Sequence, residues 1–206
     1  MTTHNAFEDK LRIREVVENW AVWRDARDWD RFATVWARDG RMMATWTQGS
    51  SAEFIEASKQ GWDKGVRILH FLGGSSVDVA GDRAIVQTKM TITQRVDVEG
   101  VRCDIICTGR FYDFFVREDG DWKVSLRQPI YEIDRLVPLE GGVWPELDAE
   151  LLASFPEGYR HLAYAQARLG YPIKLTMPLW DGEVSEALYR EGASWLAGNP
   201  LNWSGE

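Results

Sequence analysis

The chain has 206 residues, of which 45% are hydrophobic, and it carries 11 tryptophans and a net charge of −8. This length suits one domain with an appendage, or at most two small domains. The acidic charge argues against nucleic acid as a partner, because phosphate binding needs a basic face. The apolar runs are shorter than the ~20 residues of a membrane-spanning helix, and the polar N-terminus does not resemble a signal peptide. We therefore expect a cytoplasmic protein that binds neither nucleic acid nor membrane.

The first 50 residues predict two helices followed by a strand. Residues 6–26 carry apolar side chains at three-to-four spacing, which is typical of an amphipathic helix. Asp28 is a suitable N-cap for a shorter helix over residues 29–37. Residues 41–47 alternate between apolar and polar side chains and are expected to form a strand.

A third helix and a short extended segment complete the N-terminal part. The helix is predicted over residues 52–62, with Ser50 or Ser51 as its cap. The extended segment covers residues 66–72 and places His70 among apolar neighbours. Helices therefore precede most of the predicted strands.

From residue 76 onward the pattern changes to long strands joined by tight turns. Strands are expected over 76–80, 83–98, 101–117 and 122–136, with turns at Gly-Asp, Glu-Gly and Asp-Gly pairs. Successive antiparallel arms of this length form a strongly curved meander. No strand–helix–strand alternation is present, so the sequence predicts an α+β fold.

Residues 140–206 differ in character and begin at a glycine-rich linker. Two helices are predicted here, over 159–169 and 180–196, between repeated prolines. The segment is too short and too interrupted to hold a core of its own, so we expect a helical extension packed on the domain or on a neighbouring subunit.

The cysteines and histidines show no metal-binding spacing. Cys103 and Cys107 are four residues apart in one strand, roughly 13 Å at ~3.3 Å per residue, which is too far for a disulfide. They are expected to be buried and apolar in character. His4, His70 and His161 are widely separated and match no metal motif. We expect no metal and no cofactor.

Asp25 and His70 are the residues that best combine into a catalytic pair. A carboxylate can fix the tautomer of an imidazole and stabilise its cation, which makes the imidazole a general base near neutral pH. Asp25 follows an amphipathic helix, whereas Asp28 is assigned to capping and Asp30 to solvent. The competing interpretation is that His70 is an ordinary core histidine. Spacing alone does not bring these two residues together.

Several motifs together resemble the SnoaL-like branch of the nuclear transport factor two-like superfamily. They are the elbow DARDWD at residues 25–30, His70, the hairpin VAGDRAIVQT and the turn DGDWKVS. The resemblance covers about residues 6–139. It implies N-terminal helices in the concave face of a strongly curved, mainly antiparallel sheet, a cone-shaped α+β barrel that encloses an apolar pocket. Residues 1–139 would form this domain, and 140–206 an added lid or oligomer arm.

The resemblance also implies roles for particular residues. Scytalone dehydratase, hexachlorocyclohexane dehydrochlorinase and bile-acid dehydratase pair an Asp with a His at the positions of Asp25 and His70. The dehydrochlorinase uses an arginine for the leaving group at the position of Arg127, and a lysine at the position of Trp20. Because Trp20 stands where the dehydrochlorinase has a lysine, the resemblance does not extend to halide elimination. The expected pocket walls are aromatic: Trp23, Trp46, Tyr112, Phe114 and Tyr131.

The resulting hypothesis is a cofactor-independent lyase that removes water from a hydrophobic, cyclic or polyketide- or terpenoid-like small molecule. His70 would abstract a proton from carbon, Asp25 would orient it, and Arg127 or Tyr131 would stabilise the developing anion. Two alternatives remain open: a ketosteroid-type isomerase, and a non-catalytic binding or assembly module. A homo-oligomer, either dimer or trimer, is expected because the meander offers a broad convex face.

Overall fold

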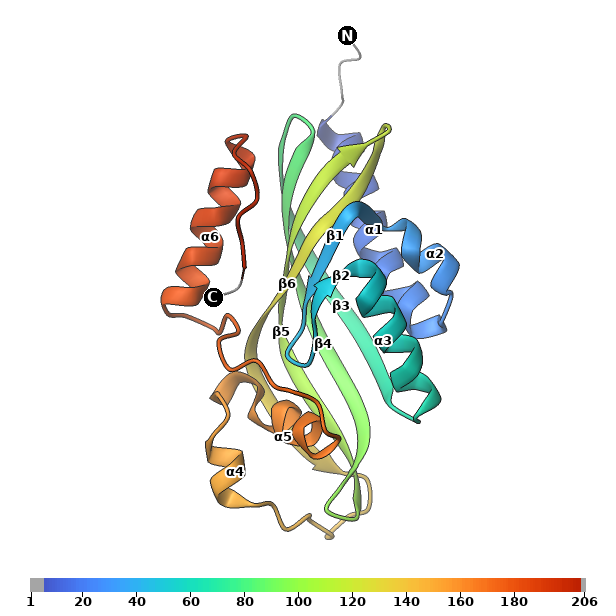
Figure 1. Ribbon diagram of the computed structural model, residues 1–206, viewed down its shortest axis with the longest axis vertical. Coiled ribbons are helices and arrows are strands. Elements are labelled where there is room, and N and C mark those ends of the chain that lie inside the picture. Colours follow the sequence, from blue (N-terminus) through green and yellow to red (C-terminus); the bar gives the residue numbers. More distant parts are fainter. Residues whose placement is uncertain (1–5, 205–206) are drawn as a thin grey trace.

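A curved six-stranded sheet organises the chain, as the computed structural model shows for residues 6–204 (Figure 1). The strand order is β2-β1-β6-β5-β4-β3, so β2 and β3 are free edges and the sheet does not close into a barrel. All neighbouring strands are antiparallel except β1 and β6, which run parallel. The strands are β1 (Trp36–Met43), β2 (Gln48–Ser50), β3 (Arg67–Ala80), β4 (Arg83–Val98), β5 (Val101–Glu118) and β6 (Asp121–Pro138).

Helices cover both faces of this sheet. In Figure 1, α1, α2 and α3 lie on one side and α6 lies on the opposite side, while α4 and α5 sit at the lower end. The α+β fold with N-terminal helices against a curved sheet is therefore confirmed. The helices are α1 (Ala6–Ala26), α2 (Trp29–Thr34), α3 (Ser51–Asp63), α4 (Ala149–Ala153), α5 (Arg160–Arg168) and α6 (Glu183–Leu196), with a 3-10 turn, η1, at Glu157–Tyr159.

Local sequence signals explain where several elements begin. Asp28 caps α2 through a hydrogen bond from the backbone N–H of Arg31, as predicted. Ser50 and Glu53 form a capping box at the start of α3, which satisfies two backbone donors reciprocally. The hairpin turns at Glu99-Gly100 and Asp119-Gly120 have positive φ at both central residues, the conformation that matches the twist of the flanking strands.

Several boundaries differ from the sequence-based expectation; the first strand, for example, was expected over residues 41–47 but covers Trp36–Met43. The second helix was expected to reach residue 37, but it ends at Thr34 and β1 begins at Trp36. The cause is tertiary: the backbone N–H of Val124 donates to the carbonyl of Val35, and β1 then continues along β6. The two extended segments expected on either side of Gly73-Gly74 are one strand, β3, with an irregularity between Leu72 and Ser75 that absorbs the glycines.

The sheet has an inner and an outer face, and each holds its own apolar cluster. The inner face packs against α1, α3 and α5. The cluster between them includes the fully buried side chains of Trp20, Ile105 and Phe111. The outer face packs against α6 through Phe114, Leu126, Leu188 and other buried residues. The free cysteines Cys103 and Cys107 are buried in the inner cluster, as expected.

The C-terminal extension therefore packs on its own chain. Trp195 of α6 donates its indole N–H to the carbonyl of Phe115, and Trp203 donates to Gln128. Gly192 of α6 lies against Tyr112, where a Cβ would meet the tyrosine hydroxyl at 1.9 Å. This close approach fixes α6 on the outer face. Within residues 6–204, none of the helices is long and apolar enough to cross a membrane.

If α6 is part of this core, truncating a side chain on its buried face must destabilise the whole fold. Leu188 is fully buried, so Leu188→Ala is expected to lower the free energy of unfolding by about 2–5 kcal/mol in denaturant titrations. Arg190→Ala is the matched control on the exposed face of the same helix, and should change it by less than about 0.5 kcal/mol. Equal stability of the two variants would show that α6 does not pack on the sheet.

Candidate active site

One carboxylate joins the end of α1 to the edge strand β3. Asp25 Oδ2 accepts a hydrogen bond of 2.6 Å from the backbone N–H of His70, and Asp25 Oδ1 lies 2.8 Å from His70 Nδ1. The imidazole is 5% exposed and the carboxylate 16%. Because Nδ1 is bonded to Asp25, the neutral imidazole presents the lone pair of Nε2 to other groups. The structure thus brings together the two residues that the sequence singled out.

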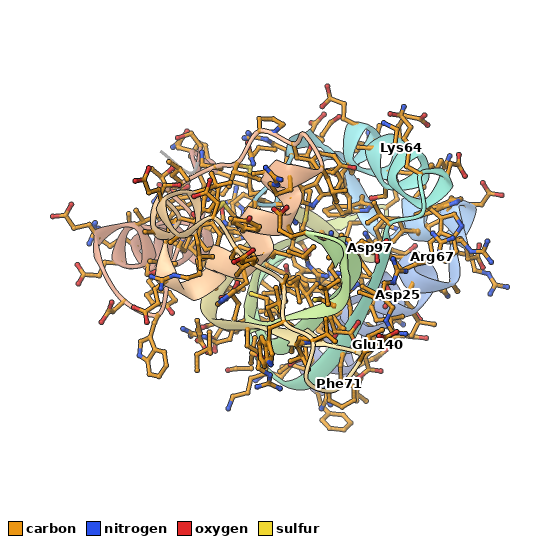
Figure 2. All side chains as sticks on the ribbon, turned by 90° about the horizontal axis from the view of Figure 1, so that it is seen from below. Asp25, Lys64, Arg67, Phe71, Asp97 and Glu140 are labelled. Carbon is orange, nitrogen blue, oxygen red and sulfur yellow. The ribbon has the colours of Figure 1, made fainter. Side chains whose placement is uncertain are left out.

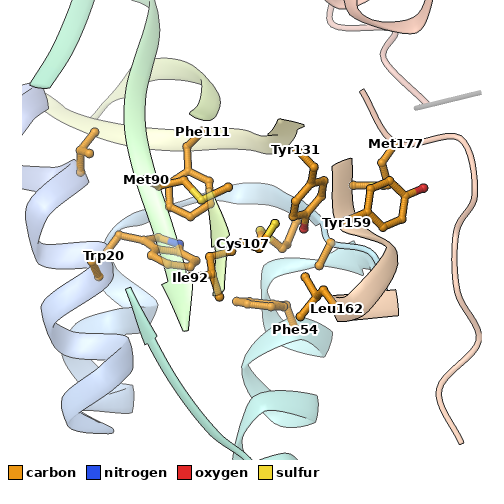
Figure 3. Close-up of a cluster of buried hydrophobic side chains, with 14 of the residues drawn as sticks. Trp20, Phe54, Met90, Ile92, Cys107, Phe111, Tyr131, Tyr159, Leu162 and Met177 are labelled. Atoms are coloured by element: carbon orange, nitrogen blue, oxygen red, sulfur yellow. The ribbon is translucent and has the colours of Figure 1, made fainter. Parts of the chain in front are cut away.

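His70 faces a cavity of two adjacent compartments between the inner face of the sheet, α1, α3 and α5. The inner compartment includes His70, Trp20 and Tyr131, and the outer one includes Asp25 and Trp62. Figure 3 shows several of the apolar side chains that line the inner compartment, including Trp20, Tyr131 and Leu162 of α5. Five residues line both compartments: Arg24, Trp46, Ile68, Gln94 and Gln166.

The cavity is narrow. Each compartment has a volume of about 30 Å³, whereas a cavity that holds benzene has about 150 Å³. A substrate with a ring system therefore requires wall side chains to move. The walls that belong to the C-terminal extension are Leu162, Gln166 and Tyr171.

Burial sets the protonation state of His70. Desolvation lowers its pKa from 6.5 to about 4, and the positive charges of Arg24 and Arg127 act in the same direction. The hydrogen bond and the charge of Asp25 oppose this change without cancelling it. The pKa of Asp25 is lowered: burial raises it, but the hydrogen bonds from His70 and the charge of Arg24 outweigh that effect. At neutral pH the pair is a neutral imidazole beside a carboxylate.

Arg24 is a site residue that the sequence reasoning did not identify. It lines both compartments, is 8% exposed, and its Nη1 lies 3.4 Å from Asp25 Oδ1. A signal for it exists in the sequence, because Arg24 falls four residues after Trp20 on the buried stripe of α1. A charged side chain on a core-facing helical position is rare unless it is paired or functional.

Arg127, the expected partner for the leaving group, lies behind the wall of the cavity. Its guanidinium makes two hydrogen bonds with Asp113, at 2.8 and 2.7 Å, and neither side chain is exposed. It stacks on the rings of Trp20 and Phe111, with its Cζ 4.1 and 4.2 Å from their centroids. These rings line the inner compartment, whereas Arg127 does not. Its effect on His70 is therefore electrostatic.

Two of the five expected wall residues line the cavity. Trp46 and Tyr131 do so, and burial raises the pKa of Tyr131 so strongly that its hydroxyl stays protonated. Tyr112 and Phe114 lie on the outer face against α6. Trp23 lines a separate surface groove beside α2 and β6. The structure does not bring these three to the cavity.

A second histidine–aspartate pair has the same hydrogen-bond geometry, but it lies at the start of α5 and not at the cavity. Asp134 accepts hydrogen bonds from the backbone N–H groups of His161 and Leu162 at the start of α5, and lies 2.9 Å from His161 Nδ1. His161 lines neither compartment of the cavity. Asp134 thus caps α5, and the pair provides a matched control for His70. His4 lies outside the described residues.

No cluster that suits a metal ion is found in the part of the chain that the structure describes. Among residues 6–204, no group of three or more His, Cys, Asp or Glu side chains gathers at a distance that could hold a cation.

Comparison with known sequences gives a family and fungal relatives. The SnoaL-like domain model matches residues 5–128. Pea pathogenicity protein 2 of Fusarium vanettenii is 34% identical over 204 residues, which cover 94% of this chain and 88% of that protein. An uncharacterized protein of Aspergillus terreus is 35% identical over 188 residues, covering 82% of this chain and 69% of that protein.

Solved structures share the fold at low sequence identity. A protein of Novosphingobium aromaticivorans, provisionally named scytalone dehydratase, superposes with a TM-score of 0.54 at 18% identity, covering 66% of this chain and 97% of that one. A type 2 hexachlorocyclohexane dehydrochlorinase superposes with a TM-score of 0.53 at 16% identity, covering 69% and 95%. About a third of this chain therefore has no counterpart in either structure.

The lowered pKa of His70 makes a prediction for stability. Above pH 6.5 the imidazole is neutral in both the folded and the unfolded chain, but between 6.5 and about 4 only the unfolded chain takes up the proton. Stability is therefore lost as pH falls through this window. At ~1.4 kcal/mol per pH unit the difference corresponds to about 3 kcal/mol. In denaturant titrations from pH 7 to pH 4, wild type should lose about this much more than His70→Gln.

His161→Gln is the control for this measurement, because it keeps His70 and should keep the wild-type slope. If His70→Gln retains the same pH dependence as wild type, the imidazole of His70 is not held neutral in the folded protein.

Proposed function

Since the chain belongs to the SnoaL-like family, we propose that it is a cofactor-independent lyase that eliminates water from a hydrophobic, cyclic or polyketide- or terpenoid-like molecule. The observation that carries this proposal is the two-point contact between Asp25 and His70 at the wall of a buried cavity. A neutral imidazole held at Nδ1 by a carboxylate is equipped to accept a proton at Nε2.

Each member of the pair has a defined part in the proposed reaction. His70 Nε2 takes a proton from a carbon next to a carbonyl group, and the C–H electron pair forms an enolate. The enolate then expels hydroxide from the next carbon, which leaves a carbon–carbon double bond. Hydroxide regains the proton from the imidazolium and departs as water. Asp25 stabilises the imidazolium between these steps and keeps the ring in place.

The protonated hydroxyl of Tyr131 is a second proposed participant. It lines the same compartment as His70 and its raised pKa keeps it a hydrogen-bond donor. A fixed donor in a water-poor cavity stabilises developing negative charge without reorganising. The role that the resemblance implied for Arg127 is reduced to holding Trp20 and Phe111 in place and to its charge.

We further propose that the C-terminal extension acts as the lid of this cavity. The Thr45 hydroxyl donates to Gln166 at 2.6 Å, and the rings of Trp46 and Tyr171 are 5.4 Å apart. These contacts join the extension to the loop between β1 and β2. Opening them would admit a substrate that the narrow cavity does not hold, and closing them would exclude water.

A non-catalytic binding module is the second candidate, and the pair of His161 and Asp134 favours it. That pair shows that this chain uses the same hydrogen-bond geometry for capping a helix. Asp25 could likewise serve only to fasten β3 to α1. An isomerase would use the same base as the lyase but would release no water.

Proton exchange separates these functions without knowledge of the natural substrate. In D₂O, wild type should replace hydrogen next to the carbonyl group in members of a panel of cyclic ketones, observed by proton NMR. His70→Gln and Asp25→Asn should each slow this exchange by about 10²–10⁴-fold, the usual contribution of a general base. His161→Gln should exchange at the wild-type rate, since it leaves the cavity unchanged.

Hydroxylated members of the panel then distinguish elimination from isomerisation, because only elimination yields the dehydrated ketone. If His70→Gln folds as stably as wild type at pH 7 and exchanges equally fast, the base is not His70. A wild-type protein that binds ketones and exchanges none of them would support the binding module.

The pH dependence of kcat/KM follows from the same pKa. The sequence alone suggested an ionisation near neutrality, whereas burial lowers the pKa of His70 to about 4. The basic form therefore predominates throughout the neutral range. For any ketone that exchanges, kcat/KM should be level from pH 9 down to about pH 5 and then fall as the imidazole is protonated. A fall that is complete by pH 6 would contradict this environment for His70.

A further inference from the structure

Polar atoms without hydrogen-bond partners gather at the cavity. Among residues 6–204, seven buried side-chain nitrogen or oxygen atoms have no partner, and four of them belong to residues that line it. These four are Trp20 Nε1, Arg24 Nε, Ser58 Oγ and Gln94 Oε1. A buried polar group without a partner costs about 1–3 kcal/mol, so four around one cavity indicate a ligand that pairs with them.

Arg24 is the strongest donor of this group. Its one side-chain hydrogen bond within the described residues is the long contact of 3.4 Å to Asp25 Oδ1. Both oxygens of Asp25 are already engaged at shorter distances by His70. Most of the five guanidinium N–H donors are thus left for another acceptor. A buried arginine whose carboxylate neighbour is committed elsewhere is suited to bind an oxyanion.

Trp20 adds a second donor close to the base. Its ring is fully buried and meets the imidazole of His70 edge-on, with centroids 5.1 Å apart and planes at 89°. Its indole N–H has no acceptor among residues 6–204. Trp20, Arg24 and His70 all line the inner compartment. Two residues with unpaired donors and the proposed base therefore border the same compartment.

Two arginines stack on one of the residues that line the outer compartment. Trp62 lines the outer compartment, and the guanidinium groups of Arg27 and Arg67 stack on its ring with Cζ 4.5 and 3.7 Å from the centroid. Seen from below, Asp25 and Arg67 lie beside the edge strand β3 (Figure 2). Their positive charges next to a cavity wall would favour an anionic ligand, although the whole chain has a net charge of −8.

We propose that Arg24 and Trp20 form an oxyanion-binding subsite beside His70, with Gln94 as the acceptor for a second polar group of the ligand. This subsite rests on the proposed function and deepens it. The ligand would carry an oxygen atom that is negatively charged when it binds or becomes so during the reaction. When His70 takes a proton from carbon, the C–H electron pair forms the enolate double bond. The two N–H donors then donate hydrogen bonds to the enolate oxygen, which carries the negative charge.

A phenol that changes colour on ionisation tests this subsite without any turnover. The probe is 4-nitrophenol, whose phenolate mimics an enolate and has its own visible absorption band. At one pH unit below the pKa of the free probe, about a tenth of it is ionised. Wild type should bind it mainly as the phenolate. Arg24→Met should bind the phenolate about ten- to a hundredfold more weakly, the usual loss of a hydrogen bond to a charged group.

Two further variants complete the experiment. Arg38→Met, at an exposed arginine that does not line the cavity, should bind the phenolate as wild type does. Arg24→Lys keeps the charge but not the fork of donors, and should retain part of the affinity; it also serves if Arg24→Met does not fold. Wild type that binds no phenolate, or Arg24→Met and Arg24→Lys that bind it like wild type, would overturn the subsite.

The outcome is separable from that of the proposed lyase. His70→Gln should still bind the phenolate, because the two donors remain. If it does so while wild type exchanges no ketone protons, the subsite stands without the base. If ketone exchange depends on His70 but phenolate binding does not depend on Arg24, the base stands without the subsite.

Discussion

The contact between Asp25 and His70 is the constraint on which the rest of the site depends. It is made twice, once through the backbone of β3 and once through the imidazole ring, so the carboxylate positions the strand and the side chain together. Burial on the inner face of the sheet then keeps the imidazole neutral. A fold that ends α1 at this point thereby holds an imidazole that is neutral at ordinary pH, which is the property that the proposed base requires.

The cavity around this imidazole has apolar walls and a few polar groups. Some of these groups have hydrogen-bond partners and others have none. Arg127 makes two hydrogen bonds with Asp113 and stacks on two of the aromatic walls from outside the cavity. Arg24 lines the cavity itself, and its one side-chain hydrogen bond among the described residues is the long contact with Asp25. This difference is the reason for proposing Arg24, and not Arg127, as the group that binds negative charge. Residues of the C-terminal extension line one side of this cavity. The last helix of the extension, α6, covers the outer face of the sheet.

Much of the fold was predictable because it follows from local patterns: helix periodicity, the Asp28 cap and the glycine turns of the hairpins. The parallel pairing of β1 with β6 was not, because it depends on contacts distant in sequence. Tyr112 illustrates an avoidable error, since strand alternation places it opposite to the buried Cys107 face of β5. Arg24 was not predicted as a site residue, because helix periodicity places it on the buried stripe but does not show what its charge faces.

The most direct test of this description is nitrogen NMR of the histidine rings in the folded protein. The geometry predicts that His70 at neutral pH is neutral, with its proton on Nδ1 and none on Nε2, and that it becomes an imidazolium only as the pH approaches about 4. Replacing Asp25 by asparagine should disturb this tautomer. A His70 ring that carries its proton on Nε2 in the wild-type protein, or that is charged at pH 6, would contradict a base built by Asp25.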